Sequence, residues 1–283
     1  MYGVPCFSNV KHFRPRKALG QAFLTYEPTA DALAGALEVG AGDTVLEIGP
    51  GKGILTRRLV ERAGRVIAVE VDERLVQMLR AEMSGHANLE VVSADFMRYD
   101  LSAFSRLKVM GNLPYNLSSQ MLLRLLDFSG SWEMAVLTTQ REFAMRILGE
   151  PGTKSYGALT VFFERLTERE RLFNIPPDHF KPKPDVVSTA FRMVRRHKPL
   201  FEVEDEASFR RIVKVCFSQR RKTIANNIAA GLGLDKQDVA QVLAGCDVDP
   251  GARAETLAPS DFKRLADALT SGVTEAARAP VGA

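Results

Sequence analysis

Apolar residues recur with two different spacings between residues 44 and 194. Short runs rich in β-branched residues, such as Val45–Ile48, are typical of buried strands, whereas apolar residues three or four positions apart are typical of amphipathic helices. Strands are predicted at 45–48, 65–69, 89–92, 107–111, 134–138, 169–174 and 188–194. Helices are predicted at 28–37, 53–62, 72–83, 118–126, 140–148 and 155–164. This alternation predicts an α/β domain built on a seven-stranded sheet.

The last two of these strands are joined by the proline-containing segment Phe180–Ser188, which predicts an extended loop. Because this connection holds no crossover helix, we expect the pair to be antiparallel. After the basic segment Arg195–Pro199 the pattern becomes purely helical. Helices are predicted at 207–217, 223–230, 236–244 and 260–269, the last with Ser260 as its N-cap. The expected organisation is a basic flexible arm at 1–16, an α/β domain at 17–199, a helical domain at 200–271 and a disordered tail at 272–283.

Three glycines at alternate positions, Gly49, Gly51 and Gly53, follow the first predicted strand and precede a helix. Glycines at a strand-to-helix turn let the backbone approach a nucleotide closely, so the spacing predicts a nucleotide-binding loop. Ile54 stands where the dinucleotide fingerprint has its third glycine, which disfavours NAD. A Walker loop is excluded because no Gly-Lys-Ser/Thr follows.

Acidic residues end the next two predicted strands. Glu70 is placed to accept both hydroxyls of a ribose, and Asp95 is placed to accept from an adenine amine. Asp72 is predicted to cap the helix that follows Glu70, and each acid taken alone is more often a cap or a solvated residue. Ligands of open α/β sheets bind at the carboxyl ends of the strands, so together these signals predict an S-adenosylmethionine site.

The fourth strand leads into Asn112-Leu113-Pro114-Tyr115. The Asn112 amide oxygen and the Leu113 carbonyl, which Pro114 holds extended, can each accept one N–H of an exocyclic amine while Tyr115 stacks on the base. Two such acceptors make the amine lone pair available for attack on an activated methyl group without a strong base. The alternative is structural: a strand that ends at a proline, followed by a helix capped at Ser118.

Composition fits a globular protein, with 46% hydrophobic and 25% charged residues among 283. Cys6, Cys216 and Cys246 lack any C-x-x-C spacing, so neither a disulfide framework nor a metal site is indicated. No apolar run is long enough to span a membrane, and the first residues lack a signal-peptide core. We therefore expect a cytoplasmic protein without a metal.

The net charge of +4 is concentrated before residue 200, because residues 200–283 hold 11 Lys and Arg against 12 Asp and Glu. Positive charge occurs in short groups, each of which alone is more often a solvated surface. Several groups beside a pocket for a base favour an RNA or DNA backbone as partner. The candidate phosphate contacts are Lys181, Lys183, Arg220, Arg221 and Lys222.

From Lys17 to Leu269 the sequence resembles the ribosomal RNA adenine N6,N6-dimethyltransferase family, and specifically the members that modify small-subunit rRNA. The resemblance includes the motifs above and four further segments. These are Lys17–Leu24, Gln140–Glu142, Phe180–Ser188, and Phe217–Thr223 followed by Asn226 and Asn227. The chain departs from the family at Ala22, where relatives carry a larger polar residue, and at Ala225, where they commonly carry arginine.

The resemblance implies a Rossmann-like class I methyltransferase sheet with a C-terminal helical RNA-binding domain. It implies S-adenosylmethionine as cofactor, S-adenosylhomocysteine as product, and dimethylation of two adjacent adenosines in the 3′-terminal hairpin loop of small-subunit (16S) rRNA. The implied partner is this rRNA within an assembling 30S particle, and the implied oligomeric state is a monomer. The cofactor residues it implies are Gln21, Leu24, Gly49, Gly51, Glu70, Asp95 and Asn112. The base-site residues are Asn112, Leu113, Pro114, Tyr115 and Phe180, although Phe180 fits a core position beneath the proline loop equally well.

Two other functions remain open at this point. One is a macrolide-resistance methyltransferase acting on large-subunit rRNA, whose motif more often has Ile where this chain has Leu113. The other is a largely non-catalytic assembly or transcription accessory protein that keeps the same fold.

Overall fold

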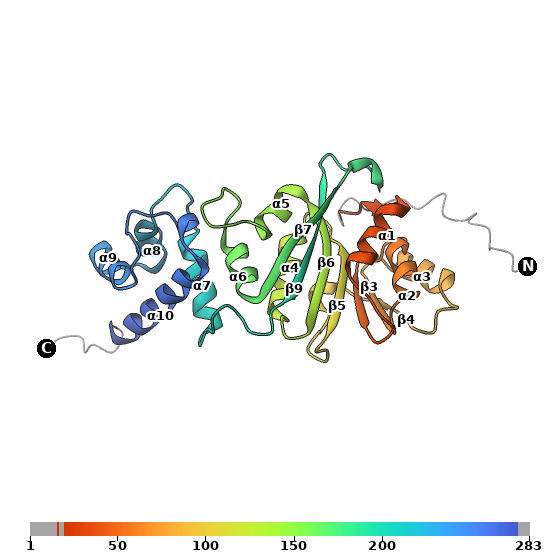
Figure 1. Ribbon diagram of the computed structural model, residues 1–283, viewed down its shortest axis with the longest axis horizontal. Coiled ribbons are helices and arrows are strands. Elements are labelled where there is room, and N and C mark those ends of the chain that lie inside the picture. The colour runs from red at the N-terminus through yellow and green to blue at the C-terminus, as the bar shows by residue number, and fades with distance from the viewer. Residues whose placement is uncertain (1–15, 17–19, 277–283) are drawn as a thin grey trace, which may run out of the picture.

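The structure is a computed structural model that describes residue 16 and residues 20–276 (Figure 1). Its main sheet has seven strands in the order β4-β3-β2-β5-β6-β9-β7. They are β2 (Thr44–Ile48), β3 (Arg65–Glu70), β4 (Leu89–Ser93), β5 (Leu107–Asn112), β6 (Trp132–Gln140), β7 (Thr167–Ile175) and β9 (Ser188–Arg195). Strands β2 to β6 are parallel, whereas β9 pairs antiparallel with both β6 and β7. The predicted seven-stranded α/β fold and its antiparallel last pair are confirmed.

Helices cover both faces of the sheet. The first three are α1 (Glu27–Ala36), α2 (Ile54–Val60) and α3 (Glu73–Glu82), and the next three are α4 (Ser118–Asp127), α5 (Arg141–Ile147) and α6 (Ala158–Leu166). Val45 of β2 is buried in a cluster with residues of α1 to α3, while its neighbour Leu46 is buried with residues of α4 to α6. Successive side chains of a strand point to opposite faces, so a strand covered on both faces is mostly apolar.

A second, two-stranded sheet joins segments that are far apart in the sequence. Strand β1 (Phe23–Leu24) pairs antiparallel with β8 (Phe180–Lys181), in the register Phe23↔Lys181 and Leu24↔Phe180. The sequence predicted neither strand, because two residues give no periodicity to detect. This pairing fixes the N-terminal segment beside the carboxyl edge of the main sheet.

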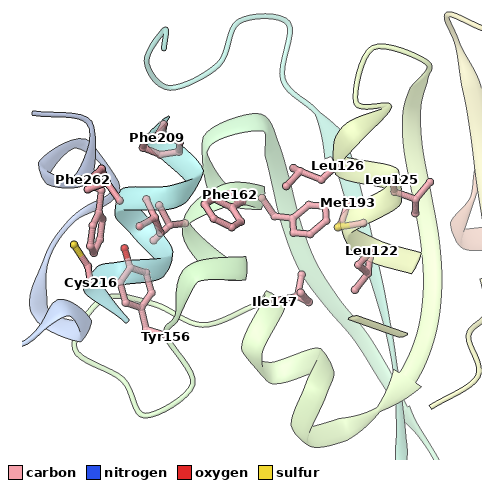
Figure 2. Packing of buried hydrophobic residues seen from close by; sticks show 14 of the residues in the cluster. Leu122, Leu125, Leu126, Ile147, Tyr156, Phe162, Met193, Phe209, Cys216 and Phe262 are labelled. Atoms are coloured by element: carbon pink, nitrogen blue, oxygen red, sulfur yellow. The ribbon is translucent and has the colours of Figure 1, made fainter. Parts of the chain in front are cut away.

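Four helices form the C-terminal domain: α7 (Glu206–Cys216), α8 (Ile224–Leu232), α9 (Lys236–Gly245) and α10 (Pro259–Ala276). They lie at one end of the elongated molecule (Figure 1). One hydrophobic cluster runs without interruption from the sheet into this domain. Figure 2 shows Phe162 of α6 between Met193 of β9 and Phe209 of α7, and the two phenylalanine rings meet edge to face at 6.2 Å. The helical domain is therefore packed on the sheet domain rather than tethered to it.

Each predicted element is present in the structure with both ends within three residues of the predicted ones, with one exception. Helix α10 begins at Pro259 and not after Ser260, and the Ala258 N–H at its start donates to the Asp261 carboxylate at 2.8 Å. It continues to Ala276 and so includes residues 272–276, the first part of the segment expected to be disordered. Residues 277–283, the basic arm except Arg16, and Cys6 lie outside the described residues. Within the described chain no helix has the length and apolar character needed to cross a membrane.

Candidate active site

A cavity of about 170 Å³ lies at the carboxyl ends of β2, β3, β4 and β5, and we call it the strand-end pocket. It opens where the strand order reverses, because β2 lies between β3 on one side and β5 on the other. Nine of the predicted site residues line it: Gln21, Gly49, Gly51, Glu70, Asp95, Asn112, Leu113, Pro114 and Tyr115. The sheet thus brings together residues that are spread over about a third of the sequence.

The glycine loop forms one wall of the pocket. Gly49, Gly51 and Gly53 all have positive φ, at 66°, 58° and 77°, a conformation that disfavours any residue with a Cβ. A Cβ on Gly51 would also come within 2.8 Å of the Phe23 ring, whereas nothing lies within 4 Å of the corresponding position on Gly49. The backbone at Gly49 is therefore exposed to whatever occupies the pocket.

Glu70 ends β3 with its side chain almost fully buried, at 5% exposure. Its two oxygens accept the N–H groups of Gly51 at 3.1 Å and Asp72 at 2.9 Å. Burial raises the pKa of this carboxyl above its usual value, and these N–H donors act in the opposite direction. Each oxygen keeps a lone pair beyond the one used here, so the carboxylate can still accept from a ligand.

The neighbouring acids act as caps. Asp72 accepts the Arg74 N–H at the start of α3, as predicted, and the Arg74 guanidinium lowers its pKa to about 2. The Gln21 side chain donates to the same carboxylate at 3.2 Å, which ties the N-terminal segment to α3. Asp95 accepts the Met97 N–H at 2.9 Å through one oxygen and is otherwise exposed at the rim of the pocket.

Asn112 ends β5 and lines the pocket together with Gly49 and Gly51. Its amide nitrogen donates to the Ala22 carbonyl at 2.9 Å, and its amide oxygen accepts the Thr138 hydroxyl at 2.6 Å. Tyr115 shares a hydrogen bond of 2.7 Å with Ser188, and burial raises the pKa of its phenol. Ser118 does not cap α4: it is the first helical residue, and its hydroxyl donates to the Pro114 carbonyl.

Two predicted site residues do not line the pocket. Leu24 and Phe180 face each other across β1 and β8, with 5% and 3% exposure, and pack in the cluster beneath α1 to α3. The position of Phe180 is the one expected of a core residue, and its ring must be uncovered before it can stack on a base. Its role at the base remains a prediction. Lys181 and Lys183 are exposed on the same loop.

The basic residues of the helical domain differ in their contacts. The Arg220 guanidinium donates to the carbonyls of Lys154 and Tyr156 and lies 3.6 Å from the Glu255 carboxylate. It therefore links the loop before α6 to the helical domain. Arg221 and Lys222 are exposed, and neither side chain has a hydrogen bond or ion pair to the residues that the structure describes. They are better placed than Arg220 to contact phosphate.

Sequence reasoning missed several residues around the pocket. Val71 lines the pocket and is 52% exposed. In the sequence it stands between Glu70 and Asp72, and an apolar residue between two candidate site acids is a signal that could have identified it. Phe23 and Phe96 also line the pocket, and their apolar side chains gave no such signal. Among the described residues, no group of His, Cys, Asp and Glu side chains is arranged to hold a metal ion.

Glu47 lies on β2, two residues before the glycine loop, and is only 1% exposed. Neither carboxyl oxygen has a hydrogen-bond partner in the described part of the chain. Burial raises its pKa from 4.5 to about 8; the nearby polar groups of Thr56 oppose this rise, and repulsion from Glu70 adds to it. Glu47 is therefore protonated at neutral pH, beneath the loop that forms the wall of the pocket.

A family model described as ribosomal RNA adenine dimethylase matches residues 12–271 of the chain. The ribosomal RNA small subunit methyltransferase A of Geobacter sulfurreducens is 41% identical over 263 residues, which cover 90% of this chain and 95% of that protein. The protein of the same name from Moorella thermoacetica is 39% identical over 270 residues, with coverage of 90% and 92%.

Solved structures give a consistent result. A dimethyladenosine transferase from Plasmodium falciparum has a TM-score of 0.76 at 24% identity, over 90% of this chain and 98% of that one. The 23S rRNA methyltransferase ErmE has a TM-score of 0.67 at 32% identity, over 88% of this chain and 99% of that one. The likeness extends through both domains of the described structure.

The buried Glu47 carboxyl predicts a pH dependence of stability. It is protonated in the folded chain and ionised in the unfolded chain between pH 4.5 and about 8, so its contribution to the free energy of unfolding falls as pH rises through that window. Glu47→Gln cannot ionise. The free energy of unfolding of this variant minus that of the parent should increase by on the order of 3 to 5 kcal/mol between pH 4.5 and about 8. Urea unfolding at several pH values measures both free energies. A difference that stays constant with pH would contradict the assignment.

Proposed function

The chain belongs to the ribosomal RNA adenine dimethylase family, and on this premise we propose that it dimethylates two adjacent adenosines in the 3′-terminal hairpin loop of small-subunit rRNA. Membership makes it an rRNA adenine dimethyltransferase. The observation that carries the proposal is the placement of Asn112, Leu113 and Tyr115 in one pocket with the glycine loop and Glu70. One side of that pocket suits a nucleoside cofactor and the other suits a flipped base.

The pocket fits S-adenosylmethionine, the cofactor that the fold implies. The open backbone at Gly49, the spare lone pairs of Glu70 and the rim carboxylate of Asp95 offer the acceptors that a ribose and an adenine need. Gln21 and Gly51 also line the pocket, and Leu24 lies in β1 beside Phe23, which lines it too. When bound, S-adenosylmethionine supplies a methyl group made electrophilic by its sulfonium.

The chain's own residues prepare the amine that attacks this methyl group. Asn112 Oδ1 and the Leu113 carbonyl each accept one N–H of the adenine N6 amine, which directs the nitrogen lone pair away from the ring system. Tyr115 lines the pocket, and its proposed role is to stack on the base. Because burial raises the pKa of Tyr115, the phenol stays protonated and does not act as a base. Methyl transfer is therefore accelerated by orienting and polarising the amine rather than by a general base.

Small-subunit rRNA is favoured as substrate by the relatives named for it, which are 41% and 39% identical to this chain. The large-subunit alternative is represented by ErmE, which is 32% identical. The proposed partner is rRNA within an assembling 30S particle, with the chain acting as a monomer. Arg221, Lys222, Lys181 and Lys183 are exposed cations suited to the RNA backbone, where contacts set affinity and register rather than sequence choice.

Glu70→Ala should weaken binding of S-adenosylhomocysteine by about 1.5 to 3 kcal/mol for each charged hydrogen bond lost. Tyr115→Ala should bind it nearly as the parent does but transfer methyl groups more slowly, because that ring faces the base. Isothermal titration calorimetry measures both affinities. Glu73→Ala, an exposed carboxylate three residues along, is the control and should leave affinity unchanged. Equal affinities for Glu70→Ala and the parent would show that Glu70 does not bind the cofactor.

Methylation of small-subunit particles by the purified chain should yield N6,N6-dimethyladenosine as the end product, detected by mass spectrometry of nucleosides. Asn112→Ala should slow both methyl transfers by about 10² to 10³, since each needs an acceptor to polarise the amine. Accumulation of N6-methyladenosine alone, or modification confined to large-subunit RNA, would refute the proposal.

Replacement of Arg221 and Lys222 together by alanine should weaken binding to the particle and reduce the slope of log affinity against log salt by up to about two units. Arg220→Ala is the matched control. Because its guanidinium bonds to protein carbonyls, this variant should lower the melting temperature and leave the salt slope close to that of the parent. The assignment fails if Arg220→Ala changes the slope and the double variant does not.

A further inference from the structure

The carboxamide of Asn112 is held at both ends. Its nitrogen donates to the Ala22 carbonyl at 2.9 Å, and its oxygen accepts the Thr138 hydroxyl at 2.6 Å. A backbone carbonyl can only accept, so the end of the amide that faces Ala22 must be the NH₂ group. The chemistry of the two partners thus fixes which way the amide points, and Oδ1 keeps one lone pair that Thr138 does not use.

Thr138 also contacts the second acceptor of the proposed site. Its backbone carbonyl accepts the Leu113 N–H at 3.0 Å, and Thr138 pairs with Asn112 in the register between β5 and β6. One residue of β6 therefore sets the position of the Asn112 amide through its side chain and of the Leu113 peptide through its backbone. Thr138 itself is 1% exposed and does not line the strand-end pocket.

We propose that Thr138 is a positioning residue for methyl transfer, whose hydroxyl holds Asn112 Oδ1 where its remaining lone pair accepts the N6 amine of the target base. This inference rests on the proposed function, because it acts only through the Asn112 amide. Without the hydroxyl the amide oxygen loses its only described partner, and the amide is held at the Ala22 end alone.

The rest of the loop has anchors of its own. Ser118 donates to the Pro114 carbonyl at 2.9 Å and bonds to the Thr139 hydroxyl at 2.7 Å, while Tyr115 bonds to Ser188 at 2.7 Å. Ser118, Thr139 and Ser188 are each at most 1% exposed. These bonds keep the loop backbone and the tyrosine ring in place when the Thr138 hydroxyl is removed, so the effect is confined to Asn112.

Thr138→Val removes the hydroxyl and keeps the branched shape, whereas Thr138→Ser keeps the hydroxyl. The full chain would be assayed on small-subunit particles for kcat and KM, and by calorimetry for its affinity for S-adenosylhomocysteine. We expect Thr138→Val to lower kcat by up to about 10²-fold, with KM and the affinity unchanged, because the acceptor is misplaced and not removed. Thr138→Ser should recover most of the lost kcat.

Thr167→Val is the matched control for lost stability. The Thr167 hydroxyl is equally buried and donates to the Phe163 carbonyl at 2.7 Å, away from the pocket, so this variant should keep the parent's kcat. A double-mutant cycle adds a second test. In the Asn112→Ala background, Thr138→Val should have no further effect on kcat, because the residue through which it acts is gone.

A kcat for Thr138→Val equal to that of an active parent would overturn the inference, as would a full additional loss in the Asn112→Ala background. A Thr138→Ser variant as slow as Thr138→Val would overturn it too, because the hydroxyl would then not be the cause. A parent that forms no dimethyladenosine would overturn the proposed function and this inference with it.

Discussion

The parallel pairing of β2 with both β3 and β5 is the constraint on which the site depends. Parallel strands bring their carboxyl ends to one edge of a sheet, and the order β3-β2-β5 places the glycine loop between the ends of its two neighbours. Glu70 and Asn112 therefore lie at strand ends on either side of Gly49 and line one pocket, although 42 residues separate them. A shift of one residue in either pairing would turn one of these side chains to the opposite face of the sheet.

Sequence reasoning identified the parts of the site that depend on local signals. Strand ends, the glycine loop and the Asp72 cap follow from residues within a few positions of one another, and the structure contains each of them. It did not provide the strand order, in which β9 lies between β6 and β7, because strand pairing depends on contacts between distant segments. The antiparallel direction of that pair did follow, from the absence of a crossover helix in the connection.

The roles of individual side chains were less predictable, because they too depend on contacts between distant segments. Arg220 lies in a basic run, but its guanidinium bonds to carbonyls 64 and 66 residues away. Phe180 lies in a proline-rich loop, but its pairing with Leu24 places its ring in the core. Thr138 gave no signal in the sequence, because its contact with Asn112 exists only once β5 and β6 are aligned.

The hydrophobic cluster that joins the two domains also limits how the molecule can move. Phe162, Phe209 and Phe262 belong to one core, so a swing of the helical domain away from the sheet would expose apolar side chains to water and is disfavoured (Figure 2). This packing favours a constant distance between the strand-end pocket and the pair Arg221 and Lys222. If RNA contacts both, as we propose, the distance along the RNA between the contacted phosphates and a nucleotide would help to decide which nucleotide reaches the pocket.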